Sequence, residues 1–213
     1  MDRKEALALF PHRFVPATGD RARLALLLLH GTGGDENDLL PLGPLLARGA
    51  ALLSPRGRVL EGAMPRWFRR VTEGVFDVPD LKRRTAELLD FVAAARAAYQ
   101  IEGVPLVAAG FSNGANIAGG ILLIDPAALD GAILLRAMTP FTPETPPLLT
   151  GKPVFLGAGR YDPLSRPDET ERWAATLRGY GADVTLHWSP IGHALSEEDV
   201  SAAAAWIVER FGG

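Results

Sequence analysis

The sequence predicts an α/β fold in which helices cover both faces of a mostly parallel sheet. Short apolar runs typical of buried strands alternate along the chain with longer segments that have helical spacing. Such alternation favours parallel strands, because each return to the same edge of the sheet passes through a crossover helix. The 213 residues contain no internal repeat and no linker-like stretch, so we expect one domain over residues 1–213.

Strands are expected where short apolar runs end at turn residues. The run from Leu24 to Leu29 is rich in leucine, which also suits a helix, but the glycine cluster after His30 stops it early and favours a strand. The run before Gly110 has no polar alternation, which indicates burial on both faces. The expected strands are residues 12–16, 22–29, 50–54, 104–109, 131–135, 154–158 and 184–188.

Helices are expected where apolar positions recur with helical spacing. Leu81, Leu88 and Val92 fall on one face of a segment that starts after Pro79. The last helix begins near Ser196 with acidic residues in its first turn, as in a capping box. The expected helices are residues 37–48 (interrupted near its two prolines), 80–99, 115–124, 168–180 and 196–211, whereas residues 55–79 and 138–150 are expected to be irregular.

Composition excludes several classes of function. The absence of cysteine rules out disulfides, cysteine–zinc sites and a thiol nucleophile. A net charge of −3 provides no electrostatic basis for binding nucleic acid or an anionic membrane surface. No apolar run approaches the ~20 residues that span a bilayer, and the N-terminus lacks the apolar core of a secretion signal. We therefore expect a cytoplasmic protein without membrane insertion.

The sequence Gly110-Phe111-Ser112-Asn113-Gly114 predicts a nucleophilic serine. Taken alone, Gly-x-Ser-x-Gly is often an ordinary turn, but here a predicted strand precedes it and a predicted helix follows it. In that context the serine occupies a sharp turn, where a side chain at either glycine would collide with neighbouring backbone. The turn presents the hydroxyl above the sheet, next to the N-terminus of the helix.

A serine hydroxyl needs a base to remove its proton, and the base needs an acid to orient it. In a doubly wound sheet such groups gather in loops after the carboxyl ends of the strands. Asp162 and His193 lie in two such loops, and the chain order serine, acid, histidine is the one expected with this turn. Asp168 is the alternative acid, although its position also suits helix capping. We interpret the other histidines as structural: His12, His30 and His187.

A developing oxyanion requires preorganised hydrogen-bond donors. We expect the backbone N–H of Asn113, directly after the serine, to be one of them. The second is expected from Thr32, because the glycines around it allow the backbone of that loop to come close. A simple strand-ending turn is the alternative interpretation of this glycine cluster.

Together these segments resemble the phospholipase/carboxylesterase family of the α/β-hydrolase superfamily, which includes small bacterial carboxylesterases and acyl-protein thioesterases. The resemblance implies an α/β-hydrolase fold and hydrolysis of small or short-acyl carboxylic esters through an acyl-enzyme, with no metal and no organic cofactor. Asn113 stands where the thioesterases usually carry glutamine, which favours the esterase branch. The matching segments lie between about residues 25 and 194, and they are residues 29–34, 66–77, 110–114, 159–163 and 192–193.

The spacing after the strand at 131–135 bears on the substrate. Proteins of this superfamily often carry a lid domain there, but residues 136–152 are too few for a helical cap, so we expect no lid and an open cleft. Arg66, Arg69 and Arg70 either attract an acidic substrate or form a solvated surface patch. The residues expected to line the cleft are Trp67, Phe68, Phe76, Met138, Phe141 and Leu164, with packing against the sheet edge as the alternative for the first two.

Three other functions are compatible with these residues. The chain could be an acyl thioesterase, a non-catalytic binding protein on the same fold, or a cofactor-free perhydrolase that uses the same three residues. The expected partner is a small-molecule ester, and the oligomeric state stays open, with a homodimer as one option.

Overall fold

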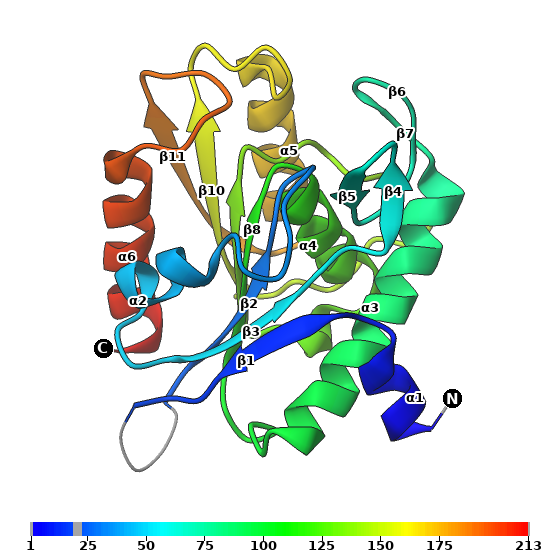
Figure 1. Cartoon of the computed structure of the whole chain (residues 1–213). Helices are drawn as coiled ribbons and strands as arrows, with labels where there is room; N and C mark the ends of the chain where they lie inside the picture. Colours follow the sequence, from blue (N-terminus) through cyan, green and yellow to red (C-terminus); the bar gives the residue numbers. More distant parts are fainter. Residues whose placement is uncertain (1, 19–22, 213) are drawn as a thin grey trace.

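A seven-stranded sheet runs through the molecule with helices on both faces (Figure 1). The computed structural model describes residues 2–18 and 23–212. The strand order is β1-β3-β2-β8-β9-β10-β11; β1 is antiparallel to β3, and the other neighbouring pairs of this sheet are parallel. The strands are β1 (His12–Val15), β2 (Ala25–Leu29), β3 (Ala51–Pro55), β8 (Leu106–Phe111), β9 (Gly131–Leu135), β10 (Pro153–Gly159) and β11 (Asp183–Ser189). The predicted mostly parallel α/β fold is therefore confirmed.

The helices divide between the two faces of the sheet. One face packs against α3 (Val78–Ala98), α4 (Asn113–Ile124) and α5 (Pro167–Gly179), and the other against α2 (Gly43–Leu46) and α6 (Glu197–Phe211). A short N-terminal helix, α1 (Arg3–Ala8), lies against α3. Two 3₁₀ turns complete the helical segments of the described residues: Leu40–Leu42 and Pro126–Ala128.

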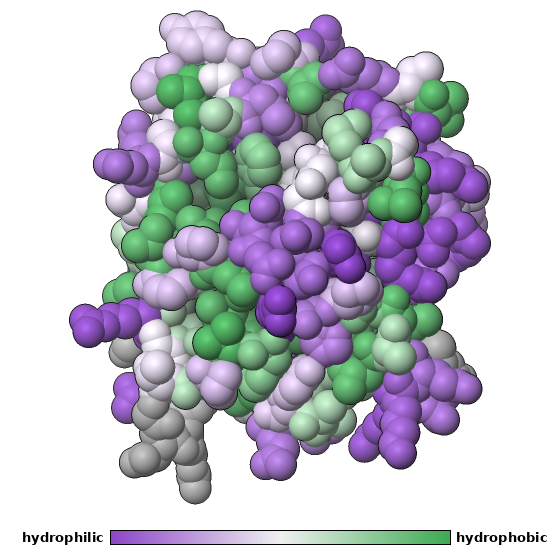
Figure 2. All heavy atoms as spheres, in the orientation of Figure 1, coloured by the Kyte–Doolittle hydropathy of each residue, from purple (hydrophilic) through white to green (hydrophobic). Residues whose placement is uncertain are grey.

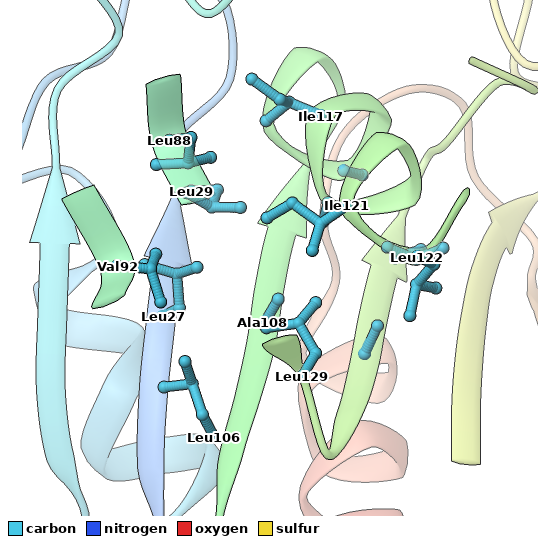
Figure 3. Packing of buried hydrophobic residues seen from close by; sticks show 14 of the residues in the cluster. Leu27, Leu29, Leu88, Val92, Leu106, Ala108, Ile117, Ile121, Leu122 and Leu129 are labelled. Atoms are coloured by element: carbon cyan, nitrogen blue, oxygen red, sulfur yellow. The ribbon is translucent and has the colours of Figure 1, made fainter. Parts of the chain in front are cut away.

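Burial on both faces explains why the leucine run forms a strand. All five residues of β2 are buried, and alternate leucines belong to the two separate hydrophobic clusters of the core. Figure 3 shows Leu27 and Leu29 packed with Leu88 and Val92 of α3. Burying a leucine side chain fully stabilises the fold by about 1.5–3 kcal/mol relative to leaving it exposed. In a central strand, side chains on both faces are buried. The predicted start at Ala22 lies outside the described residues.

Residues 55–79, which we expected to be irregular, contain two hairpins. The first joins β4 (Val59–Glu61) to β5 (Met64–Arg66), and the second joins β6 (Arg70–Thr72) to β7 (Val75–Phe76). Gly62 and Gly74 permit the turns with φ of 61° and 76°. Strands of two or three residues are too short to show the alternation that reveals a strand in a sequence.

The connection from β9 to β10 carries no lid. Residues 136–152 are all described, and none of them is helical or part of a strand, so this connection forms no helical cap.

The expected interrupted helix at residues 37–48 is shorter than predicted. Its two prolines reduce it to the 3₁₀ turn Leu40–Leu42 and the single turn of α2.

Apolar side chains on the surface lie among polar ones on the face shown in Figure 2. In the described part of the chain, no helix combines the length and apolar character that crossing a membrane requires. Among the more exposed large apolar side chains, several belong to the two hairpins: Leu60, Met64, Val71 and Val75.

Candidate active site

The turn between β8 and α4 holds Ser112 in a strained backbone conformation. Its φ of 53° and ψ of −115° lie outside the ordinary regions for a residue with a side chain. A Cβ at Gly110 would lie 2.5 Å from the carbonyl oxygen of Gly114, and one at Gly114 would overlap the carbonyl oxygen of Leu29. The predicted need for glycine at both positions is confirmed, and it arises from backbone passing close to backbone.

Three side chains from separate loops form a continuous hydrogen-bonded chain beside this turn. His193 Nε2 lies 2.8 Å from Ser112 Oγ, and His193 Nδ1 lies 2.8 Å from Asp162 Oδ2. The carboxylate can only accept, so Nδ1 carries the proton and Nε2 is free to accept from the hydroxyl. The loops follow β8, β10 and β11, so the parallel strands bring residues far apart in the sequence to one edge of the sheet.

Asp162 is held in its charged form. Burial of the carboxyl raises the pKa of Asp162, but hydrogen bonds from His193 and from the backbone N–H groups of Ser165 and Leu164 outweigh that effect, so the pKa lies below its ordinary value. Its side chain is fully buried, while that of His193 is 25% exposed. The carboxylate therefore remains an acceptor for the imidazole N–H over a wide pH range.

Thr32 and Asn113, whose backbone N–H groups are the expected oxyanion donors, line the same cavity as Ser112 and His193. In the part of the chain that the structure describes, neither N–H donates a hydrogen bond. The side chains of these two residues are hydrogen-bonded to the end of β5 and the residue after it. Asn113 Oδ1 accepts from the backbone N–H of Trp67 at 2.8 Å, and Thr32 Oγ1 accepts from the guanidinium of Arg66, the last residue of β5, at 2.9 Å.

His30 supports the glycine loop, as we interpreted from the sequence. Its Nε2 accepts the Gly57 N–H at 2.9 Å, so Nδ1 carries the proton and donates to the carbonyl oxygen of Gly31 at 2.6 Å. Burial lowers the pKa of His30, which keeps this ring neutral. The ring therefore links the backbone that follows β2 to the backbone that follows β3.

The cavity at these residues has a volume of about 230 Å³. Phe76, Met138 and Leu164 line it, as expected from the sequence. The other residues of its wall are Thr32, Arg66, Arg70, Glu73, Gly74, Phe111, Ser112, Asn113, Asn116, Arg136 and His193.

Trp67, Phe68 and Phe141 do not line the cavity, which corrects our expectation for these three residues. Trp67 and Phe68 are 1% and 0% exposed and belong to the core cluster on the α3, α4 and α5 face of the sheet. The indole N–H of Trp67 donates to the carbonyl oxygen of His30 at 2.8 Å, so the ring packs inward. Phe141 belongs to the same cluster. An aromatic residue in a loop can face either way, and only the packing around it decides.

The arginines of the same segment have different environments. Arg66 is buried and Arg70 is partly buried; both line the cavity, and both pair with the carboxylate of Glu61. Burial, and then the neighbouring charge of Arg70, lowers the pKa of Arg66. Arg69 lies at the surface and pairs with Asp77. Two of the three therefore face the cavity, and one belongs to the surface.

The alternative residues named from the sequence lie elsewhere. Asp168 is exposed in the first turn of α5, where it pairs with Arg172 at 2.9 Å. His12 bonds the Tyr99 hydroxyl at 2.7 Å, and His187 lies within β11. Among the described residues, no group of three or more histidine or carboxylate side chains could hold a metal ion.

Arg136, which follows β9, was not among the residues expected at the site from the sequence. It lines the cavity and is 1% exposed, and its guanidinium pairs with Asp199 at 2.6 Å. The signal was a charged residue directly after an apolar strand, at the edge where the other site residues also follow their strands.

Three comparisons place the chain among known proteins. It is 44% identical over 198 residues to the protein named "Putative hydrolase MhqD" from Bacillus subtilis, covering 93% of this chain and 98% of that protein. It matches the crystal structure of the Bacillus cereus carboxylesterase with a TM-score of 0.93 and 41% identity, covering 99% of this chain and 100% of the other. A carboxylesterase from Mesorhizobium loti matches with a TM-score of 0.86 and 30% identity, over 93% of this chain and 94% of that one.

No family model matches the chain. The sequence identity over nearly the whole length, the fold and the family-specific segments all indicate the same family, so the family assignment does not depend on such a model. The chain belongs to the phospholipase/carboxylesterase family of α/β-hydrolase-fold proteins.

Proposed function

We propose that this protein hydrolyses small or short-acyl carboxylic esters through an acyl-enzyme on Ser112. The observation that carries the proposal is the continuous chain of two 2.8 Å contacts from Ser112 through His193 to Asp162 at the cavity. The hydrolase family of the chain supports the same chemistry.

The first half-reaction forms the acyl-enzyme. His193 Nε2 takes the proton of Ser112, whose oxygen attacks the ester carbonyl. Asp162 holds the imidazole in the required tautomer and stabilises the imidazolium that forms. The imidazolium then gives the proton to the leaving alkoxide as the ester C–O bond breaks, and the alcohol departs.

Hydrolysis of the acyl-enzyme repeats the same steps with water. His193 deprotonates the water, which attacks the acyl carbonyl; the bond to Ser112 breaks, and the serine oxygen regains its proton. In both halves the oxyanion accepts from the N–H groups of Thr32 and Asn113. Losing one such donor typically costs about 10²–10³ in kcat. No step requires a metal or an organic cofactor.

The cavity wall supports a preference for small acyl groups. The volume of about 230 Å³, the apolar side chains of Phe76, Met138 and Leu164, and the absence of a helical cap over residues 136–152 all favour short or flat groups in an open cleft.

Labelling with a serine-directed fluorophosphonate, followed by peptide mapping, tests the proposal. We expect modification at Ser112 and its loss in Ser112→Ala and His193→Ala. Ser54→Ala serves as the control serine, because Ser54 is buried in β3 and does not line the cavity. A folded protein that neither reacts nor hydrolyses any ester would instead support a binding function.

A panel of p-nitrophenyl esters then defines the substrate. We expect kcat/KM to fall as the acyl chain lengthens, and to be unaffected by a metal chelator. Matched oxygen and sulfur esters separate the esterase from an acyl thioesterase: a clear preference for the sulfur ester would overturn the assignment to carboxylic esters while leaving the serine mechanism intact.

A further inference from the structure

The end of β9 contacts both the turn that carries the serine and the loop that carries the acid. The carbonyl oxygen of Leu135 accepts the backbone N–H of Ser112 at 2.8 Å. The next carbonyl oxygen, that of Arg136, accepts from the hydroxyl of Ser165 at 3.1 Å. The N–H of Ser165 in turn donates to Asp162 Oδ1. Two consecutive residues thus hold two of the three loops.

The guanidinium of Arg136 contacts the third loop at its start, its middle and its end. That loop connects β11 to α6 and carries His193. Nη2 lies 2.9 Å from the hydroxyl oxygen of Ser189, the last residue of β11, and Nε donates to the carbonyl oxygen of Gly192 at 3.1 Å. Nη1 and Nη2 donate to both carboxylate oxygens of Asp199, in the first turn of α6, at 3.2 and 2.6 Å.

The cost of this arrangement indicates a role beyond stability. The side chains of Arg136 and Asp199 are both 0% exposed, and burying an ion pair is often no better for stability than apolar packing of the same volume. Arg136 also has a φ of 58°, in a region that residues with side chains rarely adopt. Such strain is retained where a particular geometry matters.

We propose that Arg136 is a positioning residue for the base of the reaction. Its planar guanidinium holds the His193 loop at three points, which places the imidazole between Ser112 and Asp162. The proposal rests on the function proposed above. Lysine cannot replace arginine here, because an ammonium is a compact point charge and lacks the rigid fork of donors.

Two charge-balanced variants test this role. Arg136→Lys keeps a cation opposite Asp199, and Arg136→Met combined with Asp199→Asn removes both charges. In both we expect kcat for p-nitrophenyl acetate and the rate of fluorophosphonate labelling to fall by about 10- to 100-fold, as for a small misplacement of a catalytic group. We expect KM to stay within about twofold, because the apolar side chains of the cavity wall, Phe76, Met138 and Leu164, are unchanged.

Matched controls separate positioning from loss of stability. Arg84→Met removes a partly buried arginine that pairs with Asp80 and Glu87 on α3, away from the three loops, and we expect the kcat of the parent protein. Ser189→Ala removes one of the three loop contacts without changing charge, and we expect a smaller fall in kcat than in Arg136→Lys. Ser54→Ala is its buried control.

The outcomes distinguish the two proposals. If the parent protein neither hydrolyses esters nor labels at Ser112, the proposed function fails. If the parent is active and folded Arg136→Lys retains its kcat and labelling rate, the positioning role is overturned. The positioning role is also overturned if Arg84→Met loses as much kcat as Arg136→Lys when the two variants show the same decrease in Tm. Should both charge-balanced variants fail to fold, an unchanged kcat in Ser189→Ala overturns the role.

Discussion

Gly114 shows how a single residue makes the serine turn feasible. A Cβ there would overlap the carbonyl oxygen of Leu29, which belongs to β2 and cannot move without disturbing the centre of the sheet. The requirement comes from space and not from backbone conformation, since the φ of Gly114 is not positive. The same reasoning applies to Gly110 on the strand side of the turn.

We therefore expect Gly114→Ala to be strongly destabilising. The added methyl group has no room, and overpacking of this kind costs about 1–3 kcal/mol or more. Gly179→Ala is the matched control: it lies at the end of α5 with no atom within 4 Å of the added Cβ, so it should leave stability unchanged or raise it by up to about 1 kcal/mol. Urea unfolding measures both, and equal stabilities of the two variants would contradict the steric argument.

Asp162 provides a second test at the residue scale. Asparagine has nearly the same shape, but its side chain ends in one acceptor oxygen and one donor NH₂ group. Asp162→Asn therefore favours the wrong tautomer of His193. By analogy with other serine–histidine–aspartate sites we expect kcat to fall by about 10⁴. Steady-state kinetics on p-nitrophenyl acetate measure the effect, and far-ultraviolet circular dichroism checks that the fold is retained. A decrease of less than tenfold would show that the acid lies elsewhere.

The segment between β3 and α3, which holds the two hairpins, divides its aromatic residues between core and cavity. Phe68 is fully buried, whereas Phe76, whose ring lies 5.1 Å away in an edge-to-face contact, lines the cavity. Neighbouring aromatic side chains of this segment thus have different roles, one in packing and one at the site.

Alanine substitutions separate these two roles. Phe68→Ala should cost about 3–5 kcal/mol of stability, because it leaves a cavity in the core. Phe76→Ala should cost less and should instead change KM or the preferred acyl length, because it enlarges the cavity wall. Urea unfolding combined with a series of p-nitrophenyl esters gives both quantities. Equal losses of stability with no change in ester preference would contradict the assignment of Phe76 to the cavity wall.

Across the whole molecule, three buried carboxylates make stability depend on pH. Burial raises the pKa of Asp80, Asp162 and Asp199, but hydrogen bonds and neighbouring cations outweigh it, so each pKa lies below its ordinary value. The principal partners are Arg83 for Asp80 and Arg136 for Asp199.

A depressed folded-state pKa means that the stabilisation is present above the unfolded-state value and is lost as the pH falls through the folded-state value. With ordinary aspartate pKa values of about 3.9, we expect the free energy of unfolding from these groups to be constant above about pH 5 and to fall progressively below about pH 4. Urea unfolding at several pH values measures it. Greater stability at pH 3 than at pH 6 would contradict the assignment.

Much of the fold follows from local patterns. The buried strands, the long helices and the glycine–serine–glycine turn were predictable because they depend on periodicity and on sterics between close neighbours in the chain. The order of the serine, acid and histidine along the chain likewise indicated which loops meet. The short hairpins were not predictable, since strands of two or three residues leave no periodic signal.

The sequence by itself determined the α/β fold, the serine turn and the candidate residues Ser112, Asp162 and His193, because each depends on a local pattern or on the order of strands in a parallel sheet. Only the tertiary structure decided that Trp67 and Phe68 pack inward while Phe76 faces the cavity, and that Arg136 reaches Asp199 across 63 positions of the chain. The physical reason is that burial and ion pairing depend on which distant segments supply the neighbouring atoms, and no local pattern records that choice.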